Sequence, residues 1–462
     1  MNKKIIKQLA EIVGVQHVSD DPIELMVHSR DASPLFEEFP VVVVRPGTAQ
    51  EVSEVLGVAN KNNIRVITKT GATTPWGASV PRQKGLMIIQ MGRMNRVLDI
   101  DENAMVVTVE AGCTWTRLER TINPRGWRVG VMPHSCGMSS GVAGNITAGS
   151  GTSQYSAKFG LQIDNIMGLE VVLPNGSIIK TGSGAIDGAK QFDKNSGTPA
   201  DITGLFWGSA GMFGILTQVT LRMYAMPVVT QYQLHAFETP SAAQRMIYRV
   251  QKNDIASGLF FFSRESVATT GWPLPIAHLV TGSIEGSNQT EVDGKAETYR
   301  TIARDEGGQE IKDIGAVLGA IYTDKLMRYT FGNETYFPGG GRFCLNTAFP
   351  IMRLEEYLSR TAVMGKKHGI NPFGVVFIAK NTLYGLQYFP YYEREPEQRR
   401  KALAAGAEAM EANAAAGMGS WCMAGILAPA FYSRMNKNTF AFIESIKKAV
   451  DPNNIMVAPW EN

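Results

Sequence analysis

The sequence predicts an α+β protein built from two large lobes. Its 462 residues exceed what a single hydrophobic core usually serves. The first half opens with a strand–helix–strand pattern and continues with short strands separated by glycine-rich loops, whereas from about residue 228 the elements lengthen and glycine thins out. We therefore expect a first lobe over 1–227, a second over 228–430, and a C-terminal segment over 431–462 that returns to the first lobe.

The first elements follow from hydrophobic periodicity. Residues 1 to about 35 are expected to be helical, because Ile5, Leu9 and Ile12 recur at helical spacing. "VVVV" predicts a buried strand, and the following helix begins at Thr48, with Glu51 three residues later as in a capping box. A second strand, "IRVI", completes a βαβ unit.

Further elements alternate strands with turns. Strands are expected at "GLMIIQM", "VLDID" and "MVVTVEAGC", followed by a helix over "TWTRLERTINPRG". Pro174-Asn175-Gly176 predicts the turn of a hairpin, and another strand is expected over Gly214–Met223. Near the C-terminus, "EREPEQRRKALAAGAEAMEANAAAGMG" and "NKNTFAFIESIKKAVDPNNIMVAP" predict two helices, the first ending at glycine and the second before Asp451-Pro452.

Composition excludes several classes of function. The 45 basic and 42 acidic residues nearly balance, so nothing favours nucleic acid as a partner. No signal peptide and no apolar run long enough for a membrane span are apparent, and we expect a cytoplasmic protein. The four cysteines form no CxxC pair and the six histidines are isolated, so no metal site is expected.

The stretch "TKTGATTPWGASVPR" (68–82) follows the second strand and is rich in small residues and threonines. Backbone N–H groups and threonine hydroxyls in such a loop can hold a pyrophosphate. The residues that fit this role are Thr70, Gly71, Ala72, Thr73, Thr74 and Gly77. Neither a GxGxxG fingerprint nor a P-loop is present, and alone the stretch fits an ordinary surface loop equally well.

A second small-residue zone, "PHSCGMSSGVAGNITAGSGTSQYSAKFG" (133–160), strengthens the interpretation. Two such loops in one lobe, each near the end of a strand, suggest one long cofactor lying between them. His134 differs from the other histidines because it lies within this zone, where it could contact a ligand.

The chain resembles flavoproteins of the vanillyl-alcohol oxidase / 4-cresol dehydrogenase superfamily, which share a fold with glycolate oxidase and D-lactate dehydrogenase flavin subunits. The resemblance rests on "VVVVRPGTAQEVSEVLGVANKNNIRVITKTGATT", "MGRMNRVLDIDENAMVVTVEAGCTWTRL", "GLEVVLPNGSIIKTGSGA", "GLFWGSAGMFGILTQVTLRM", "GGGRFCLNTAFP" and "DPNNIMVAP". These segments occur in the expected order across almost the whole chain.

The resemblance implies a PCMH-type FAD-binding domain over 1–227 and an α+β cap over 228–430, an antiparallel sheet flanked by helices. The resemblance also implies that the cofactor is FAD, with contacts from both loops, from the strand after Gly214 and from Arg342. Beyond the six residues of the first loop, the expected cofactor-binding residues are His134, Ser135, Gly141, Gly144, Asn145, Gly214, Ile215 and Arg342.

The residues that depart from the family pattern suggest a different substrate. Where relatives hold a phenolate with two tyrosines and an arginine, this chain has Trp76 and the pair Trp421-Cys422, and the family's acid/base aspartate falls near Leu161. Tryptophan and cysteine cannot replace those donors, so a buried phenolate would lack partners. Two indoles instead favour an apolar or aromatic substrate, although both could simply pack the lobe.

Arg342 falls where the family's flavin-linking histidine lies, so we expect non-covalent FAD on that side; a tether through a tyrosine elsewhere stays open. Its charge could stabilise reduced flavin or bind a substrate carboxylate, or it could be structural. Tyr384 and Lys380 are further polar candidates on the cap. The expected catalytic residues are Arg342, Tyr384, Trp421 and Trp76.

The function expected from this resemblance is hydride transfer to flavin N5 from an alcohol, hydroxylated or benzylic carbon of a fairly apolar small molecule. Electrons would pass to a protein partner or to O₂. A 2-hydroxy-acid dehydrogenase subunit and a flavin-binding scaffold remain alternatives. A homo-oligomer or a subunit of a complex is expected.

Overall fold

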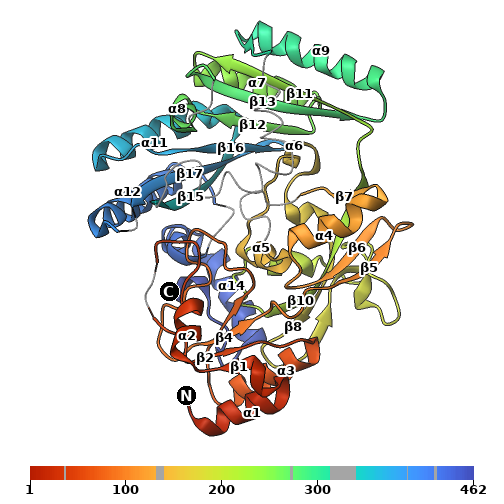
Figure 1. Cartoon of the computed structure of the whole chain (residues 1–462), viewed down its shortest axis with the longest axis vertical. Coiled ribbons are helices and arrows are strands. Elements are labelled where there is room, and N and C mark those ends of the chain that lie inside the picture. Colours follow the sequence, from red (N-terminus) through yellow and green to blue (C-terminus); the bar gives the residue numbers. More distant parts are fainter. Residues whose placement is uncertain are drawn as a thin grey trace.

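The computed structural model describes residues 1–35, 38–131, 140–270, 274–312, 340–392, 394–420 and 424–461. Figure 1 shows an N-terminal lobe, coloured red to yellow-green, below a second lobe formed by a large sheet with helices on its outer side. The N-terminal lobe contains two sheets, and the second lobe contains one sheet of seven strands, in the order β14-β11-β13-β12-β16-β17-β15.

The first sheet of the N-terminal lobe is the predicted βαβ unit with additions. Its order is β1-β2-β4-β3, and β4 is parallel to both β2 and β3. The strands are β1 (Val18–Ser19), β2 (Val42–Val44), β3 (Val66–Lys69) and β4 (Met87–Gln90). The crossover helix α3 (Ala49–Lys61) is capped as predicted, because Thr48 Oγ1 accepts from the Glu51 N–H at 3.1 Å.

The expectation of helix through about residue 35 is confirmed only in part. Helix α1 (Lys3–Val13) buries Leu9 and Val13, as the periodicity predicted, but ends at Gly14, whose φ is +92°. The chain then forms β1, which pairs with β2, and a short helix α2 (Pro22–His28). Residues 29–35 contain no helix, and in space they lie against the loop after β3, where Asp31 contacts Thr74.

The second sheet of the N-terminal lobe is antiparallel in every pairing. Its path is β5-β6-β10-β8-β9, and β7 also pairs with β10. Its strands are β5 (Val97–Asp101), β6 (Val106–Glu110), β7 (Trp127–Val129), β8 (Ile166–Val172), β9 (Ile178–Lys180) and β10 (Ile215–Ala225). The hairpin turn at 174–176 is confirmed, with Gly176 at a φ of +88°. Helices α4 (Trp115–Ile122) and α5 (Val142–Ala148) belong to this lobe.

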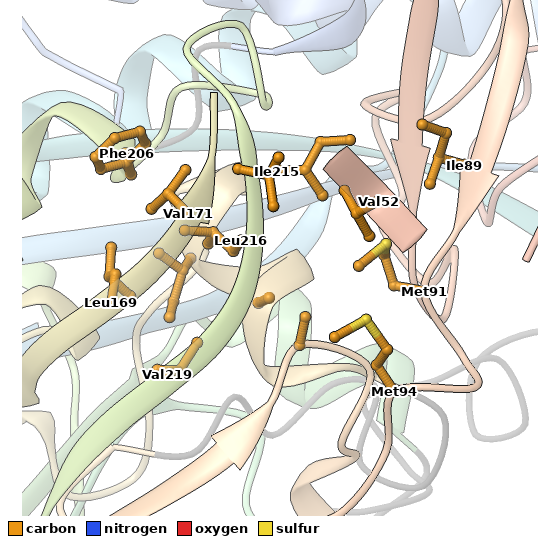
Figure 2. Packing of buried hydrophobic residues seen from close by; sticks show 14 of the residues in the cluster. Val52, Ile89, Met91, Met94, Leu169, Val171, Phe206, Ile215, Leu216 and Val219 are labelled. Atoms are coloured by element: carbon orange, nitrogen blue, oxygen red, sulfur yellow. The ribbon is translucent and has the colours of Figure 1, made fainter. Parts of the chain in front are cut away.

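One hydrophobic core joins the two N-terminal sheets. Figure 2 shows Leu169, Val171 and Val219 of the second sheet on one side, and Val52 and Ile89 of the βαβ unit on the other. All five side chains are fully buried, so the lobe packs as a single unit.

The seven-stranded sheet of the second lobe is antiparallel throughout its pairings. Its strands are β11 (Val229–Phe237), β12 (Gly258–Phe262), β13 (His278–Gly286), β14 (Gln309–Glu310), β15 (Gly340–Pro350), β16 (Phe373–Ala379) and β17 (Thr382–Tyr392). Its principal helices are α7 (Pro240–Lys252), α9 (Gln289–Asp305), α11 (Leu354–His368) and α12 (Pro396–Ala415), the last as predicted.

The two faces of this sheet have different neighbours. On β15, Phe343 lies against Gly406 of α12, and Thr347 Oγ1 accepts from the Asn413 side chain of the same helix. Because side chains alternate along a strand, Arg342 and Cys344 belong to the opposite face. That opposite face is directed towards the N-terminal lobe, and we call it the inner face.

Two ion-pair sites connect the lobes, one buried and one exposed. Arg128 of β7 donates two hydrogen bonds to the Glu285 carboxylate of β13, both at 2.6 Å, with side chains 9% and 2% exposed. Nearby, Lys380 after β16 lies 3.5 Å from Asp164, and both of those side chains are more exposed.

The C-terminal segment packs on the N-terminal lobe. Helices α13 (Ala428–Tyr432) and α14 (Lys437–Val450) precede an extended stretch in which the Val66 N–H donates to Ile455 O at 2.7 Å. Val66 and Met456 form a parallel bridge, so this stretch lies beside β3. Among the described residues, no helix combines the length and apolarity required to cross a bilayer.

Candidate cofactor site

A cleft of about 480 Å³, partly open to solvent, lies between the loop after β3 and helix α5. Strand β3 contributes Thr68 and Lys69, and the loop after it contributes residues between Thr70 and Ser79. The second loop and α5 contribute residues between Ser140 and Ala148. The full lining is Thr68, Lys69, Thr70, Ala72, Thr73, Thr74, Ala78, Ser79, Ser140, Gly141, Gly144, Asn145, Thr147, Ala148 and Ala210. The structure therefore brings the two small-residue loops together around one space.

Seven of the residues expected to contact the cofactor line this cleft. They are Thr70, Ala72, Thr73, Thr74, Gly141, Gly144 and Asn145. Gly71 and Gly77 lie in the same loop without lining the cleft. Gly214 and Ile215 lie at the start of β10, where Ile215 is 2% exposed and packs into the lobe core instead. His134 and Ser135 lie outside the described residues.

The glycines of α5 are explained by close packing. A Cβ at Gly144 would lie 2.2 Å from Thr70 Oγ1, and one at Gly141 would lie 2.8 Å from Thr70 Cβ. Glycine at both positions thus lets the second loop approach the first, so that one ligand can contact both. Gly77 has a related role, because its φ is +81° and a Cβ there would lie 2.4 Å from the Leu35 side chain.

The Asn145 side chain has a structural role that the sequence did not predict. Its Oδ1 accepts from Trp115 Nε1 at 2.7 Å and from Ser140 Oγ at 2.5 Å. The side-chain oxygen thus anchors α5 to α4 and to the second loop, which leaves the amide nitrogen for any contact with a ligand.

The chemistry of the lining fits a pyrophosphate. It includes seven threonine and serine residues, and the buried Ser79 Oγ has no hydrogen-bond partner among the described residues. Such an orphaned donor is costly unless a ligand satisfies it. These residues would hold the diphosphate of a dinucleotide such as FAD.

Lys69, which the sequence analysis overlooked, is the only charged residue among those lining the cleft. Its Nζ donates to the carbonyl oxygens of His28 and Arg30, both at 2.6 Å, and the residue is 3% exposed. Burial lowers its pKa to about 8, although the Asp31 carboxylate acts in the opposite direction. The signal in the sequence that could have identified Lys69 was its position directly before Thr70.

Asp31 connects the N-terminal segment to the first loop. One carboxylate oxygen accepts from Thr74 Oγ1 at 2.9 Å and from the Ser79 N–H at 3.5 Å, and the other accepts from the Ser33 N–H at 2.9 Å. Burial raises the pKa of this carboxyl group, while these hydrogen bonds and Lys69 act against the rise.

Trp76 is buried between the lobes. Its side chain is 4% exposed and belongs to a hydrophobic cluster with Phe260, Phe377 and Tyr388 of the second lobe. Its Nε1 has no hydrogen-bond partner among the described residues, and its carbonyl oxygen accepts from the Ile426 N–H at 3.1 Å. Its role as a substrate contact stays a prediction.

The remaining predicted catalytic residues lie in the second lobe or outside the described part. Arg342, on the inner face, is half-buried with its guanidinium 4.4 Å from the Tyr388 ring centroid. Tyr384 lies on the same face, and burial raises its pKa. Trp421 and its neighbour Cys422 lie outside the described residues. Leu161 begins a short helical turn in which Asp164 accepts its N–H at 2.9 Å.

Within the described ranges, no group of three potential metal-ligating side chains is arranged to hold a metal ion. Lone histidines there have structural surroundings. The His235 ring lies 5.5 Å from the Tyr299 ring, and burial lowers its pKa to about 4.

Comparison with known protein families gives one match, to an FAD binding domain of the FAD_binding_4 type over residues 40–182. This range contains every lining residue of the cleft except Ala210. The match therefore assigns FAD binding to the lobe that contains the cleft.

Curated relatives include flavoprotein subunits and dehydrogenases. The chain is 28% identical over 247 residues to glycolate oxidase subunit GlcD of Bacillus subtilis, covering 54% of this chain and 50% of that protein. It is 22% identical to GlcD of Escherichia coli K12, covering 88% and 80% of the two chains. D-lactate dehydrogenase [cytochrome] 1 of Saccharomyces cerevisiae is 29% identical, covering 51% and 40%. The chain thus spans half or less of two of these relatives.

Solved structures show the same fold over nearly the whole chain. A p-cresol methylhydroxylase with substrate bound matches with a TM-score of 0.86 at 19% identity, covering 98% of this chain and 95% of that one. A 4-ethylphenol oxidase from Gulosibacter chungangensis matches with a TM-score of 0.83 at 20% identity and the same coverage. The solved structures show that the chain has the PCMH-type fold, and the FAD binding domain together with the oxidoreductase relatives identifies it as an FAD-dependent oxidoreductase.

Proposed function

We propose that the protein oxidises an apolar or aromatic small molecule at an alcohol, hydroxylated or benzylic carbon. Bound FAD supplies the hydride acceptor at N5. The observation that carries the proposal is the composition of the inner face of the second lobe, which is rich in aromatic side chains and directed towards the lobe that binds the cofactor.

The aromatic residues of the inner face belong to one buried cluster. Phe260 and Phe377, paired across β12 and β16, have ring centroids 5.0 Å apart in an edge-on arrangement. Phe373 and Tyr388 continue the surface, with ring centroids 5.4 Å apart. Such faces bind ring systems through buried area and edge-to-face contacts. Trp76 belongs to the same cluster from the N-terminal lobe and helps to exclude water there.

The scarcity of charge on this surface argues against a substrate that must ionise. A phenolate would need several donors in a water-excluded site. Of the residues aligned with the family's phenolate-binding set, Trp76 offers one indole N–H. We therefore place the reacting carbon on a neutral substrate, with Tyr384 as a candidate group to hold or move a proton.

Arg342 is the observation that favours a second candidate, a 2-hydroxy-acid dehydrogenase. A guanidinium on the inner face could bind a substrate carboxylate through two parallel hydrogen bonds. Two curated relatives are named for glycolate and D-lactate oxidation, which supports this candidate. A scaffold role, with flavin bound but little turnover, is the third possibility.

Two features of the assembly remain part of the proposal. Electrons leave to O₂ or to an electron-transfer protein, and the protein works as a homo-oligomer or as a subunit of a complex. The FAD is held without a covalent bond, because Arg342 occupies the position of the family's linking histidine.

An anaerobic substrate screen tests the proposal. Loss of the flavin's visible absorbance is measured with benzylic and long-chain alcohols, with 2-hydroxy acids, and with phenols. Bleaching by neutral alcohols, unaffected in Arg342→Gln, supports the first candidate. Bleaching by 2-hydroxy acids that is lost in Arg342→Gln but kept in Arg360→Gln, a half-buried arginine of α11 that pairs with Glu356, supports the second. Bleaching by none of them would support the scaffold role.

A further inference from the structure

The N-terminal segment His28–Leu35 contacts residues that line the cofactor cleft, although it lies outside the matched FAD-binding domain, which begins at residue 40. It contacts the first loop at three places. Lys69 Nζ donates to two of its carbonyl groups, Asp31 accepts from Thr74, and Leu35 packs where Gly77 has no side chain.

We infer that Lys69 is the cationic group that binds the diphosphate of an adenosine dinucleotide in this cleft, with Asp31 as its counter-ion. The inference rests on the assignment of FAD to this cleft. It adds a charged residue from the end of β3 to a site that is otherwise built from hydroxyls and backbone N–H groups.

The geometry of Lys69 supports this role. An ammonium group has three N–H donors, and the carbonyl oxygens of His28 and Arg30 account for two of them. These two bonds fix the side chain rigidly at the cleft and leave one donor among the described residues. A fixed, desolvated charge acts on an anion more strongly than a mobile surface lysine does.

Asp31 explains how a buried lysine persists without the cofactor. Its carboxylate attracts the Lys69 ammonium, and the carboxylate also holds Thr74 and the Ser79 N–H in the first loop. A diphosphate entering the cleft gives Lys69 a second anionic partner. The same contacts orient the loop, so that Asp31 acts as a positioning residue.

The test separates charge from hydrogen bonding. Lys69→Gln keeps two N–H donors for the carbonyls of His28 and Arg30 but carries no charge. Binding of ADP and of adenosine to flavin-free protein is measured by calorimetry for wild type, Lys69→Gln and Lys180→Gln, the last an exposed lysine of β9. We expect Lys69→Gln to weaken ADP binding by about tenfold to a hundredfold while leaving adenosine binding and Lys180→Gln unchanged.

If Lys69→Gln does not fold, the pH dependence of ADP binding to the wild type tests the inference instead. The titratable groups facing Lys69 are Asp31 and the His28 ring, whose pKa burial and Lys69 lower. Burial raises the pKa of the Asp31 carboxyl. The His28 ring is already neutral above pH 7.5, because its pKa is lowered from an ordinary value of about 6.5. ADP affinity should therefore fall between pH 7.5 and 9.5 as Lys69 loses its proton, with adenosine affinity flat.

Several outcomes would overturn the inference. They are equal ADP affinity in wild type and Lys69→Gln, equal losses for ADP and adenosine, or ADP affinity that does not change with pH. If wild-type protein binds FAD and ADP but shows these results, only the role of Lys69 fails. If wild-type protein binds no FAD, the cofactor assignment fails with it.

Discussion

The buried ion pair between Arg128 and Glu285 should contribute strongly to the docking of the two lobes. Replacing Glu285 by leucine removes both acceptors while nearly keeping the side-chain volume. The two hydrogen bonds are charge-assisted, and the side chains are 9% and 2% exposed, so solvent screens them little. At about 1.5–3 kcal/mol for each such bond, the loss is about 3–6 kcal/mol.

The same range follows from the cost of leaving one ion unpaired. Removing one partner of a buried pair typically costs about 3–5 kcal/mol, whereas replacing both partners by apolar groups is often nearly neutral. The guanidinium of Arg128 lies 4.6 Å from the Tyr155 ring centroid, and this contact compensates only partly for a missing carboxylate. The double variant Arg128→Leu/Glu285→Leu should therefore recover most of the stability.

Urea unfolding followed by tryptophan fluorescence and by flavin release measures these effects. The control is Arg245→Leu, which breaks a more exposed pair with Glu306 and should cost less than about 1 kcal/mol. A second, earlier transition in Glu285→Leu would show that the lobes separate before they unfold. The reasoning is refuted if Glu285→Leu is no less stable than the control variant, or if the double variant is as unstable as the single one.

Three other expectations concern the cofactor cleft and the second lobe. Gly144→Ala places a Cβ 2.2 Å from Thr70 Oγ1 and should lower the apo-protein's free energy of unfolding by about 1–3 kcal/mol, with recovery in Gly144→Ala/Thr70→Ala but not in Gly144→Ala/Thr70→Ser. Acid precipitation should leave the yellow colour in the supernatant, and colour in the pellet would contradict non-covalent FAD. His235 has a pKa of about 4 when folded and about 6.5 when unfolded, so the unfolded chain binds more protons between these values. This group should therefore make the free energy of unfolding rise between pH 4 and 6.5, by up to about 1.4 kcal/mol per pH unit. His235→Gln should flatten this rise. An unchanged slope in the variant would assign the rise to other groups.

Local patterns in the sequence were enough to predict much of the fold. The capping residues Thr48 and Glu51, the turn at Gly176 and the alanine-rich helix α12 all depend on neighbours close along the chain, and all are confirmed. The helix expected through residue 35 was wrong between α1 and α2 and again after His28. Between the two helices, the pairing of β1 with β2, a tertiary contact, decides the structure.

The cofactor cleft was predicted in outline, and its charged member was missed. Threonines and glycines after a strand are visible as a pattern, so Thr70 to Thr74 could be found. The role of Lys69 depends on hydrogen bonds to carbonyl groups 39 and 41 residues earlier, which no local pattern reveals. Asn145 was predicted to contact the ligand, but its side-chain oxygen accepts a hydrogen bond from Trp115, which lies near it only in the folded chain.

The stretch beside β3 has a consequence for biosynthesis. The Val66 N–H bonds to Ile455, and Gly425 fits closely against the backbone of Trp76, so residues from the end of the chain support the strand and loop that lead into the cleft. A ribosome makes these residues hundreds of codons after the loop itself. The nascent N-terminal lobe would therefore lack this support until Ile455 has been made, and FAD would be captured stably only after that point.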